Sequence, residues 1–120
     1  MAGSRLELTA GAIALIDLGV PSGHEAGFAR PTVIVTAQEA LDANPRVLQV
    51  VPVTSKLRGY RTDVPLAAGS SGLQSASVAQ CQHIRSVSVA RITEIVGQVS
   101  SVELRQMREV LGLLIDALPP

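Results

Sequence analysis

The sequence contains very few aromatic residues. Its 120 residues include one phenylalanine, one tyrosine and no tryptophan, although 47% of them are hydrophobic. The core must therefore consist of aliphatic side chains. A chain of this length can bury a substantial core, so we expect a single domain over residues 1–120, with a poorly ordered start over residues 1–10.

Cysteine and long apolar runs are also scarce. The only cysteine, Cys81, excludes an internal disulfide and fits a reducing compartment. No apolar run approaches the roughly 18 residues that are needed to cross a bilayer. No basic start leads into an apolar region, so we expect no signal peptide and no membrane partner. The prediction is a soluble cytoplasmic protein.

The chain has no net charge, but its charges are unevenly distributed. Lysines and arginines number 10, as do aspartates and glutamates. Between residues 43 and 91, however, six basic residues face a single acidic one, Asp63. A local positive face on a neutral protein can bind phosphate groups, with less long-range steering. A scatter of solvated side chains is the alternative, and charge alone does not separate the two.

Short β-branched runs separated by turn residues indicate a mainly β protein. We predict strands at 12–18, 32–36, 46–54, 62–66, 77–85 and 93–99, with short helical turns at 37–44 and 88–91. The strand at 32–36 is expected to be buried on both faces. Pro52 lacks an N–H group, which predicts a bulge or a sheet edge at that point.

The clearest helix is the last one. Ser100 and Glu103 have the spacing of a capping box, and Leu104, Met107, Leu111, Leu114 and Leu118 then recur on one face. Pro119 and Pro120 are expected to end this helix. The predicted architecture is a small antiparallel barrel or curled sheet with a C-terminal helix packed on it.

Arg30 is the most prominent candidate for a functional side chain. It stands where a loop at 19–30 meets a strand that begins with Pro31, so its position should be well defined. Thr54 likewise ends a predicted strand next to a polar turn. No His, Cys, Asp and Glu cluster has metal-ligand spacing, and no phosphate-binding glycine motif is present, so we predict neither a metal site nor a cofactor.

Arg30 and Thr54 suit a reaction that needs only charge and hydrogen bonds. Cleavage of RNA by its own 2′-hydroxyl is such a reaction, because a guanidinium neutralises the charge that develops on phosphorus. The general base is open between His24, His83 and Glu25. An ordinary surface position for each histidine, and an ion pair with Arg30 for Glu25, are the alternatives.

With these segments laid out, the chain resembles the MazF/PemK (Kid) family of toxin endoribonucleases of type II toxin–antitoxin systems. The resemblance covers roughly residues 11–116 and consists of six short stretches in the family's order. These stretches are Gly11-Ala12-Ile13 with Asp17-Leu18, Gly23-His24-Glu25, Arg30-Pro31-Thr32-Val33-Ile34-Val35, Val51-Pro52-Val53-Thr54-Ser55, Arg58-Gly59-Tyr60 with Val64-Pro65-Leu66, and Gly72-Leu73 with Ser77-Val78-Ala79 and Ile84-Arg85.

This resemblance implies an SH3-like antiparallel barrel with a C-terminal helix, the fold of the CcdB and MazF toxins, and a homodimer. It implies sequence-specific, metal-independent cleavage of single-stranded RNA that leaves a 2′,3′-cyclic phosphate and a 5′-hydroxyl. A cognate antitoxin is the implied protein partner. Arg30, Thr54 and Glu25 fall on the family's catalytic positions. The side chains expected to contact RNA are His24, Phe28, Ser55, Lys56, Arg58, Arg61, His83 and Arg85.

The chain departs from the family pattern in two places. Residues 26–29 replace a stretch that usually contains glutamine and glycine, and Gln82-His83 replaces an Asp-Gln pair. We therefore expect its choice of RNA sequence to differ, and Phe28 either to stack on a base or to shield the core. Two other functions are considered: a CcdB-like poison of DNA gyrase, and a barrel that binds RNA or peptide with weakened activity.

Overall fold

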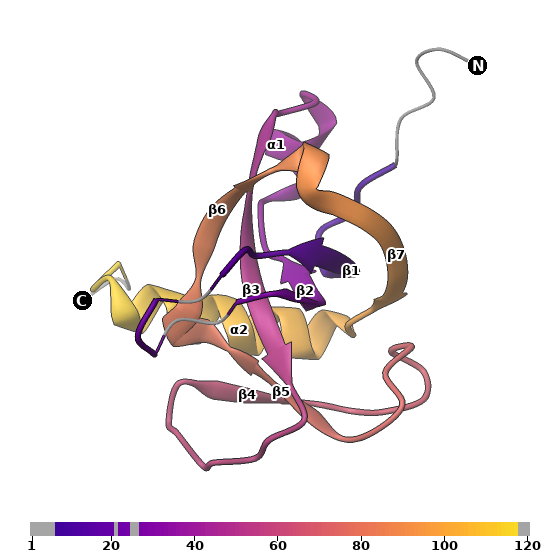
Figure 1. Cartoon of the computed structure of the whole chain (residues 1–120). Coiled ribbons are helices and arrows are strands. Elements are labelled where there is room, and N and C mark those ends of the chain that lie inside the picture. The colour runs from indigo at the N-terminus through magenta and orange to yellow at the C-terminus, as the bar shows by residue number, and fades with distance from the viewer. Residues whose placement is uncertain (1–6, 21, 25–26, 118–120) are drawn as a thin grey trace.

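The protein is a curled antiparallel sheet with one long helix packed across it (Figure 1). The structure, a computed structural model, describes residues 7–20, 22–24 and 27–117. Along the sheet the strands are ordered β4-β5-β3-β2-β1-β7, and β6 also pairs with β3. The elements are β1 (Ala12–Asp17), β2 (Ala29–Ile34), α1 (Gln38–Asp42), β3 (Val47–Thr54), β4 (Asp63–Leu66), β5 (Ser77–Gln80), η1 (Cys81–His83), β6 (Arg85–Ser88), η2 (Val89–Arg91), β7 (Ile92–Gln98) and α2 (Ser101–Leu114).

Alternating side chains of the central strands fill two aliphatic clusters, one on each face of the sheet. Ile13, Val33 and Val51 belong to the cluster that packs against α2. Their neighbours Ala14 and Ile34 belong to the other cluster. This is the two-residue period of a strand, and it confirms the prediction that residues 32–36 are buried on both faces.

The start of the chain is partly described. Of residues 1–10, which the sequence predicts to be poorly ordered, residues 1–6 lie outside the described part. Leu8 and Ala10 pack against the second cluster. In Figure 1, β6 and β7 curve away from η2 around the central strands, so that the sheet folds back on itself.

Helix α2 begins with the predicted capping box. The Ser100 hydroxyl accepts a hydrogen bond from the Glu103 amide at 3.0 Å, and the Glu103 carboxylate accepts one from the Ser100 amide at 2.8 Å. The other carboxylate oxygen of Glu103 accepts from Ala67 N at 2.8 Å, which joins the helix to the β4–β5 loop. Met107 is fully buried on the sheet.

The end of α2 differs from the prediction. The helix ends at Leu114, before the proline pair, because the chain turns at Asp116, whose φ is 54°. Leu118, Pro119 and Pro120 lie outside the described residues. The apolar face is therefore shorter than its spacing suggests, and Leu114 is 44% exposed.

The strand predicted at 77–85 is shorter in the structure: β5 ends at Gln80, and a separate strand, β6, begins only at Arg85 and extends to Ser88. The expected strand at 77–85 is interrupted by η1, a single turn of 3-10 helix. Before the break β5 pairs with Val53 and Thr54 of β3, and after it β6 pairs with Val47–Val50. The turn η1 lets residues 77–88 pair with both ends of β3, which bends with the curled sheet.

Pro52 is not at a sheet edge, because β3 lies in the middle of the sheet. On one side Pro52 is in register with Thr32 of β2. On the other side it falls between the stretch that pairs with β6 and the stretch that pairs with β5. A residue without an N–H fits there, because on that side neither β5 nor β6 pairs with Pro52.

Cys81 is fully buried beside α2, as expected for a packed small hydrophobe. Burial, with the Asp63 carboxylate as a second cause, raises the pKa of the Cys81 thiol from 9.0 to about 12. We therefore expect a thiol reagent at pH 8 to label the folded protein at least about a hundred-fold more slowly than the urea-unfolded chain, because the Cys81 thiol is buried and stays protonated. The Cys81 thiol loses its proton at a lower pH in the unfolded chain than in the folded protein. The free energy of unfolding should therefore also fall as the pH rises from about 9 towards 12. Equal labelling rates in the two states would contradict the assignment.

Candidate active site

Arg30 is the second residue of β2, so it lies within the strand and not in the loop before it. Its backbone is in register with Ile16 of β1, which fixes the Cα position. The side chain is half-buried, and its Nε donates to the carbonyl of Gly27 at 3.1 Å. Among the described residues this is its only side-chain hydrogen bond, so the terminal guanidinium nitrogens remain available for a ligand.

The sheet register places Arg30 opposite Thr54. Strands β2 and β3 pair Ile34 with Val50, Val33 with Val51 and Thr32 with Pro52. Continuing this antiparallel register by two residues brings Arg30 level with Thr54 on the adjacent strand. Two residues that are 24 positions apart in the sequence therefore become cross-strand neighbours.

The Thr54 hydroxyl is oriented by its own turn. Its oxygen accepts a hydrogen bond from Lys56 N at 3.1 Å, just after the end of β3. A hydroxyl has one hydrogen to donate in addition to its acceptor lone pairs. Because the backbone amide occupies only an acceptor position, the O–H of Thr54 is still able to donate to a ligand.

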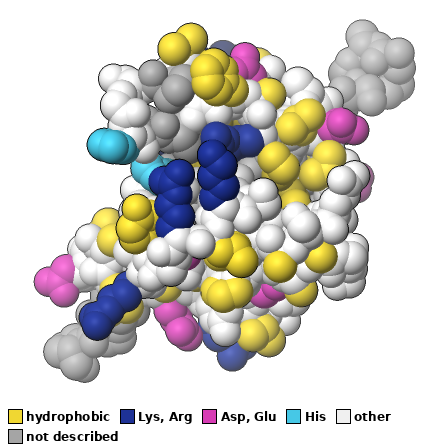
Figure 2. All heavy atoms as spheres, turned by 60° about the horizontal axis from the view of Figure 1, so that its bottom comes forward, with side chains coloured by type: hydrophobic (Ala, Val, Ile, Leu, Met, Phe, Trp, Pro, Cys, Tyr) yellow, Lys and Arg dark blue, Asp and Glu magenta, His cyan; other side chains and the backbone are white. Residues whose placement is uncertain are grey.

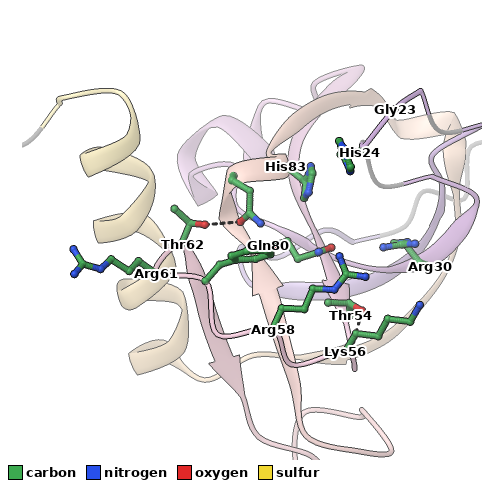
Figure 3. A pocket seen from close by; sticks show the side chains of 12 residues that line it. Gly23, His24, Arg30, Thr54, Lys56, Arg58, Arg61, Thr62, Gln80 and His83 are labelled. Atoms are coloured by element: carbon green, nitrogen blue, oxygen red, sulfur yellow. Dashed lines mark hydrogen bonds between the residues drawn. The ribbon is translucent and has the colours of Figure 1, made fainter.

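Arg30 and Thr54 both line a cavity of about 660 Å³, which we call the basic cavity. Figure 3 shows side chains converging on it from β2, from the loop after β3 and from η1. None of the described residues that line it is acidic. They are Gly23, His24, Arg30, Thr54, Lys56, Arg58, Tyr60, Arg61, Thr62, Gln80, Gln82 and His83.

The charge of this cavity is strongly positive. Figure 2 shows basic side chains gathered beside both histidines near the middle of one face, with acidic side chains towards its periphery. The sequence predicted a positive face from the segment 43–91. Its alternative, a scatter of separate charges, is wrong for Lys56 and Arg58, which meet in one cavity with Arg30. Arg61 also lines the cavity, but in Figure 3 its guanidinium points away from Arg30 and Thr54.

Two of the three candidate bases lie in the basic cavity. Figures 2 and 3 both show His24 and His83 close to each other, at one end of the cavity. His24 reaches it from the β1–β2 loop and His83 from η1. Glu25, the third candidate, lies outside the described residues.

The cavity also contains residues that sequence reasoning did not select. Tyr60, Thr62, Gln80 and Gln82 line it, and the Thr62 hydroxyl donates to the Gln82 side-chain carbonyl at 2.8 Å. Gln80 Oε1 is buried without a partner among the described residues. These side chains come together at the site because β4 pairs with β5. That pairing depends on contacts between residues far apart in the sequence, so no local pattern predicts it.

A second cavity of about 500 Å³ lies on the other side of Arg30 and Thr54, and both residues line it too. We call it the uncharged cavity, because Arg30 is the only charged residue among the described residues that line it. Phe28 and Ser55, both predicted RNA contacts, lie here rather than in the basic cavity. Arg85 lines neither cavity: its guanidinium donates to the Leu18 carbonyl at 3.1 Å, so a contact with RNA stays a prediction.

The described residues contain neither a cluster of metal ligands nor a membrane-spanning helix. Across 7–20, 22–24 and 27–117, no three His, Cys, Asp or Glu side chains come together as a metal site. Within the same residues, no helix is long and apolar enough to cross a membrane.

Comparisons with known proteins agree with this geometry. Residues 9–115 match the model of a family described as PemK-like, MazF-like toxin of type II toxin–antitoxin system. Endoribonuclease MazF9 of Mycobacterium tuberculosis is 39% identical over 111 residues, which cover 88% of this chain and 94% of that protein. The probable endoribonuclease MazF5 of the same species is 29% identical over 87 residues, 72% of this chain and 79% of its own.

Solved structures give the same result for the fold. The crystal structure of MazF from Deinococcus radiodurans has a TM-score of 0.80 and 26% identity, covering 93% of this chain and 99% of that one. A MazE–MazF crystal structure from the same organism has a TM-score of 0.76 and 27% identity, covering 95% and 100%. The predicted mainly antiparallel sheet with a C-terminal helix, of the MazF kind, is thereby confirmed.

Proposed function

The chain belongs to the PemK-like, MazF-like toxins of type II toxin–antitoxin systems and is an endoribonuclease, and we propose that it cuts single-stranded RNA at specific sequences without a metal ion, using the 2′-hydroxyl of the RNA. The 2′-oxygen attacks the adjacent phosphorus while the bond from phosphorus to the 5′-oxygen breaks. A base takes the 2′ proton, and the leaving 5′-oxygen receives one. The products are a 2′,3′-cyclic phosphate and a 5′-hydroxyl.

Arg30 and Thr54 would act together on the phosphate. The guanidinium offers planar donors that match two phosphate oxygens and neutralise the charge that develops on them. The Thr54 O–H, already oriented by Lys56 N, would donate to the same group. The cross-strand register of these two residues, in a cavity whose described lining contains no acidic side chain, is the observation that supports this proposal best.

Proton transfer is assigned to the end of the basic cavity that contains His24 and His83. An imidazole can accept the proton of the 2′-hydroxyl and return one to the leaving oxygen near neutral pH. Two histidines near each other could divide these tasks. Glu25 remains a third candidate base, from the family position that the sequence resemblance gives it.

The partners follow from the family. Crystal structures of MazE–MazF complexes exist for Deinococcus radiodurans, and we propose that this toxin likewise binds a cognate antitoxin, forms a homodimer and acts in the cytoplasm. Lys56, Arg58 and Arg61 would bind neighbouring RNA phosphates, in which case binding should weaken as the salt concentration rises.

Cleavage of labelled RNA in the presence of EDTA tests the proposal. We expect cuts at a limited set of sequences, with fragments that end in 2′,3′-cyclic phosphate. The two alternatives, gyrase poisoning and RNA binding without cleavage, would leave the RNA intact under these conditions. Activity that disappears in EDTA and returns with a divalent metal would contradict the metal-independent route.

Replacing Thr54 tests its role separately. Thr54→Ala should lower kcat/KM by about a hundred-fold, the usual effect of removing one donor to a developing oxyanion. Thr54→Ser keeps the hydroxyl and should retain most of the activity. The measurement is the initial rate of cleavage of a short RNA that contains one preferred site. Equal losses in the two variants would mean that the hydroxyl is not the functional group.

A further inference from the structure

The uncharged cavity is adjacent to the basic cavity, because Arg30 and Thr54 belong to the lining of both. A phosphate bound by this pair therefore lies next to each of the two cavities. The remaining residues of the uncharged cavity carry no charge: Gly27, Phe28, Ala29, Pro31, Val53, Ser55, Gly72, Leu73, Gln74, Ser75, Ser77 and Val96. RNA alternates anionic phosphates with uncharged, flat bases. An uncharged space next to a phosphate site therefore matches a base.

One wall of the uncharged cavity is the ring of Phe28. This side chain is 61% exposed, which excludes the alternative that it shields the core. The backbone holds it there: Phe28 N donates to Gly19 O, and Leu18 N donates to Phe28 O at 3.0 Å. Its φ is 59°, an uncommon conformation for a bulky residue. An exposed aromatic ring on a strained, well-held backbone suggests a function.

The opposite wall is the β4–β5 loop, which contains Gln74. The Gln74 side chain is exposed, and among the described residues its amide has no hydrogen-bond partner. Strand β7 holds this loop firmly, because Gln98 N donates to Ser71 O at 3.0 Å and Gly72 lies against the backbone of Val96. The backbone of the loop is therefore fixed at Ser71 and Gly72, two residues before Gln74.

We propose that the uncharged cavity binds the base of one nucleotide adjacent to the cleaved phosphate, with Phe28 stacking on the base and Gln74 hydrogen-bonding its edge. This inference rests on the proposed function. Stacking on an aromatic ring favours every base, since each has a π face. A glutamine amide offers one donor and one acceptor side by side, so it selects the base whose edge presents the complementary pair.

The two residues should have different effects on cleavage. Gln74→Ala should reduce the base preference by about five- to a hundred-fold at a single position next to the cut. Phe28→Ala should lower kcat/KM by a similar factor for every base at that position, and Phe28→Tyr should restore it. Sequencing the ends of cleaved fragments from a random RNA pool measures the base preference, and initial rates on short RNAs that differ only in that base measure kcat/KM.

Matched controls separate these effects from general damage. Val20→Ala removes an exposed apolar side chain from the loop that also contains Phe28, and Gln106→Ala removes an exposed amide from α2. Neither residue lines either cavity. Both variants should keep the rate and the sequence preference of the parent protein.

A binding experiment tests stacking without cleavage. A fluorescent RNA with a 2′-deoxy nucleotide at the cut site binds but is not cleaved, and a second version also lacks the base at the flanking position. Phe28→Ala should weaken binding of the first RNA about ten-fold and leave binding of the abasic RNA unchanged. A merely structural role for Phe28 would weaken both equally, and would overturn the inference.

The failures of the two proposals can be told apart. RNA left intact by the parent protein would refute the proposed function, and with it this inference. Cleavage by the parent protein, with an unchanged sequence preference in Gln74→Ala and an unchanged rate in Phe28→Ala, would refute the base subsite alone.

Discussion

Replacing Arg30 with alanine is expected to lower kcat/KM for RNA cleavage by at least about a thousand-fold. The loss is large because this is the half-buried guanidinium beside Thr54, and catalytic arginines that act on phosphoryl groups contribute about 10³–10⁵ in rate. Arg30→Lys should recover only part of the activity, since an ammonium cannot bind two phosphate oxygens in a planar arrangement. Initial rates on a short RNA with one preferred site measure the effect.

Stability and charge have to be controlled in this comparison. Arg105→Ala removes an exposed arginine from α2, outside both cavities, and should leave the rate within about two-fold of the parent. Arg30→Ala should keep the circular dichroism spectrum and unfold cooperatively, because the guanidinium makes only one hydrogen bond to the described residues. A rate within ten-fold of the parent would remove Arg30 from the mechanism.

Gly97→Ala should have the largest effect on stability. A Cβ atom at this position of β7 would overlap the carbonyl oxygen of Ser71 and would lie 2.7 Å from its carbonyl carbon. These are backbone atoms and cannot move aside without displacing the β4–β5 loop. We expect the free energy of unfolding to fall by about 2–4 kcal/mol, the range for overpacking at a tightly packed site. Urea denaturation monitored by circular dichroism measures it.

Ser70→Ala is the matched control for this variant. Ser70 belongs to the same loop but is exposed, so its replacement should change the free energy of unfolding by less than about 0.5 kcal/mol. A Gly97→Ala protein as stable as the parent would mean that the loop does not pack on β7 in solution. In that case Gln74 would lose its fixed position as well.

Local sequence patterns predicted the elements that depend on local physics. The short helix before Pro45 and the capping box at Ser100 are present, because each is determined by neighbouring residues. The strand predicted at 32–36 is present as β2, but it runs from Ala29 to Ile34. The break at η1 was not predicted. An alternating pattern continues through 77–85, and only the bend of β3 requires the segment to change direction there.

The candidate site was predictable to a different extent. Arg30 and Thr54 were predicted from their positions at loop–strand junctions and from the family resemblance, which also pointed to Lys56 and Arg58. Gln82 was marked only as part of a departure from the family pattern, and Gln80 was missed, because strand pairing brings it to the basic cavity and no local motif marks it. Gln74 was missed for the same reason: the contact between Gly72 and β7 joins residues about 25 positions apart.

The register that aligns Arg30 with Thr54 has a consequence for how such enzymes diversify. The distance between the two residues depends on backbone pairing in the buried middle of the sheet, which resists mutation. The β1–β2 and β4–β5 loops that flank them take no part in that pairing. Insertions or substitutions in these loops could therefore change which RNA is cut while the bond-breaking groups stay in place. Duplicated copies of such a toxin gene could acquire new targets without passing through inactive intermediates.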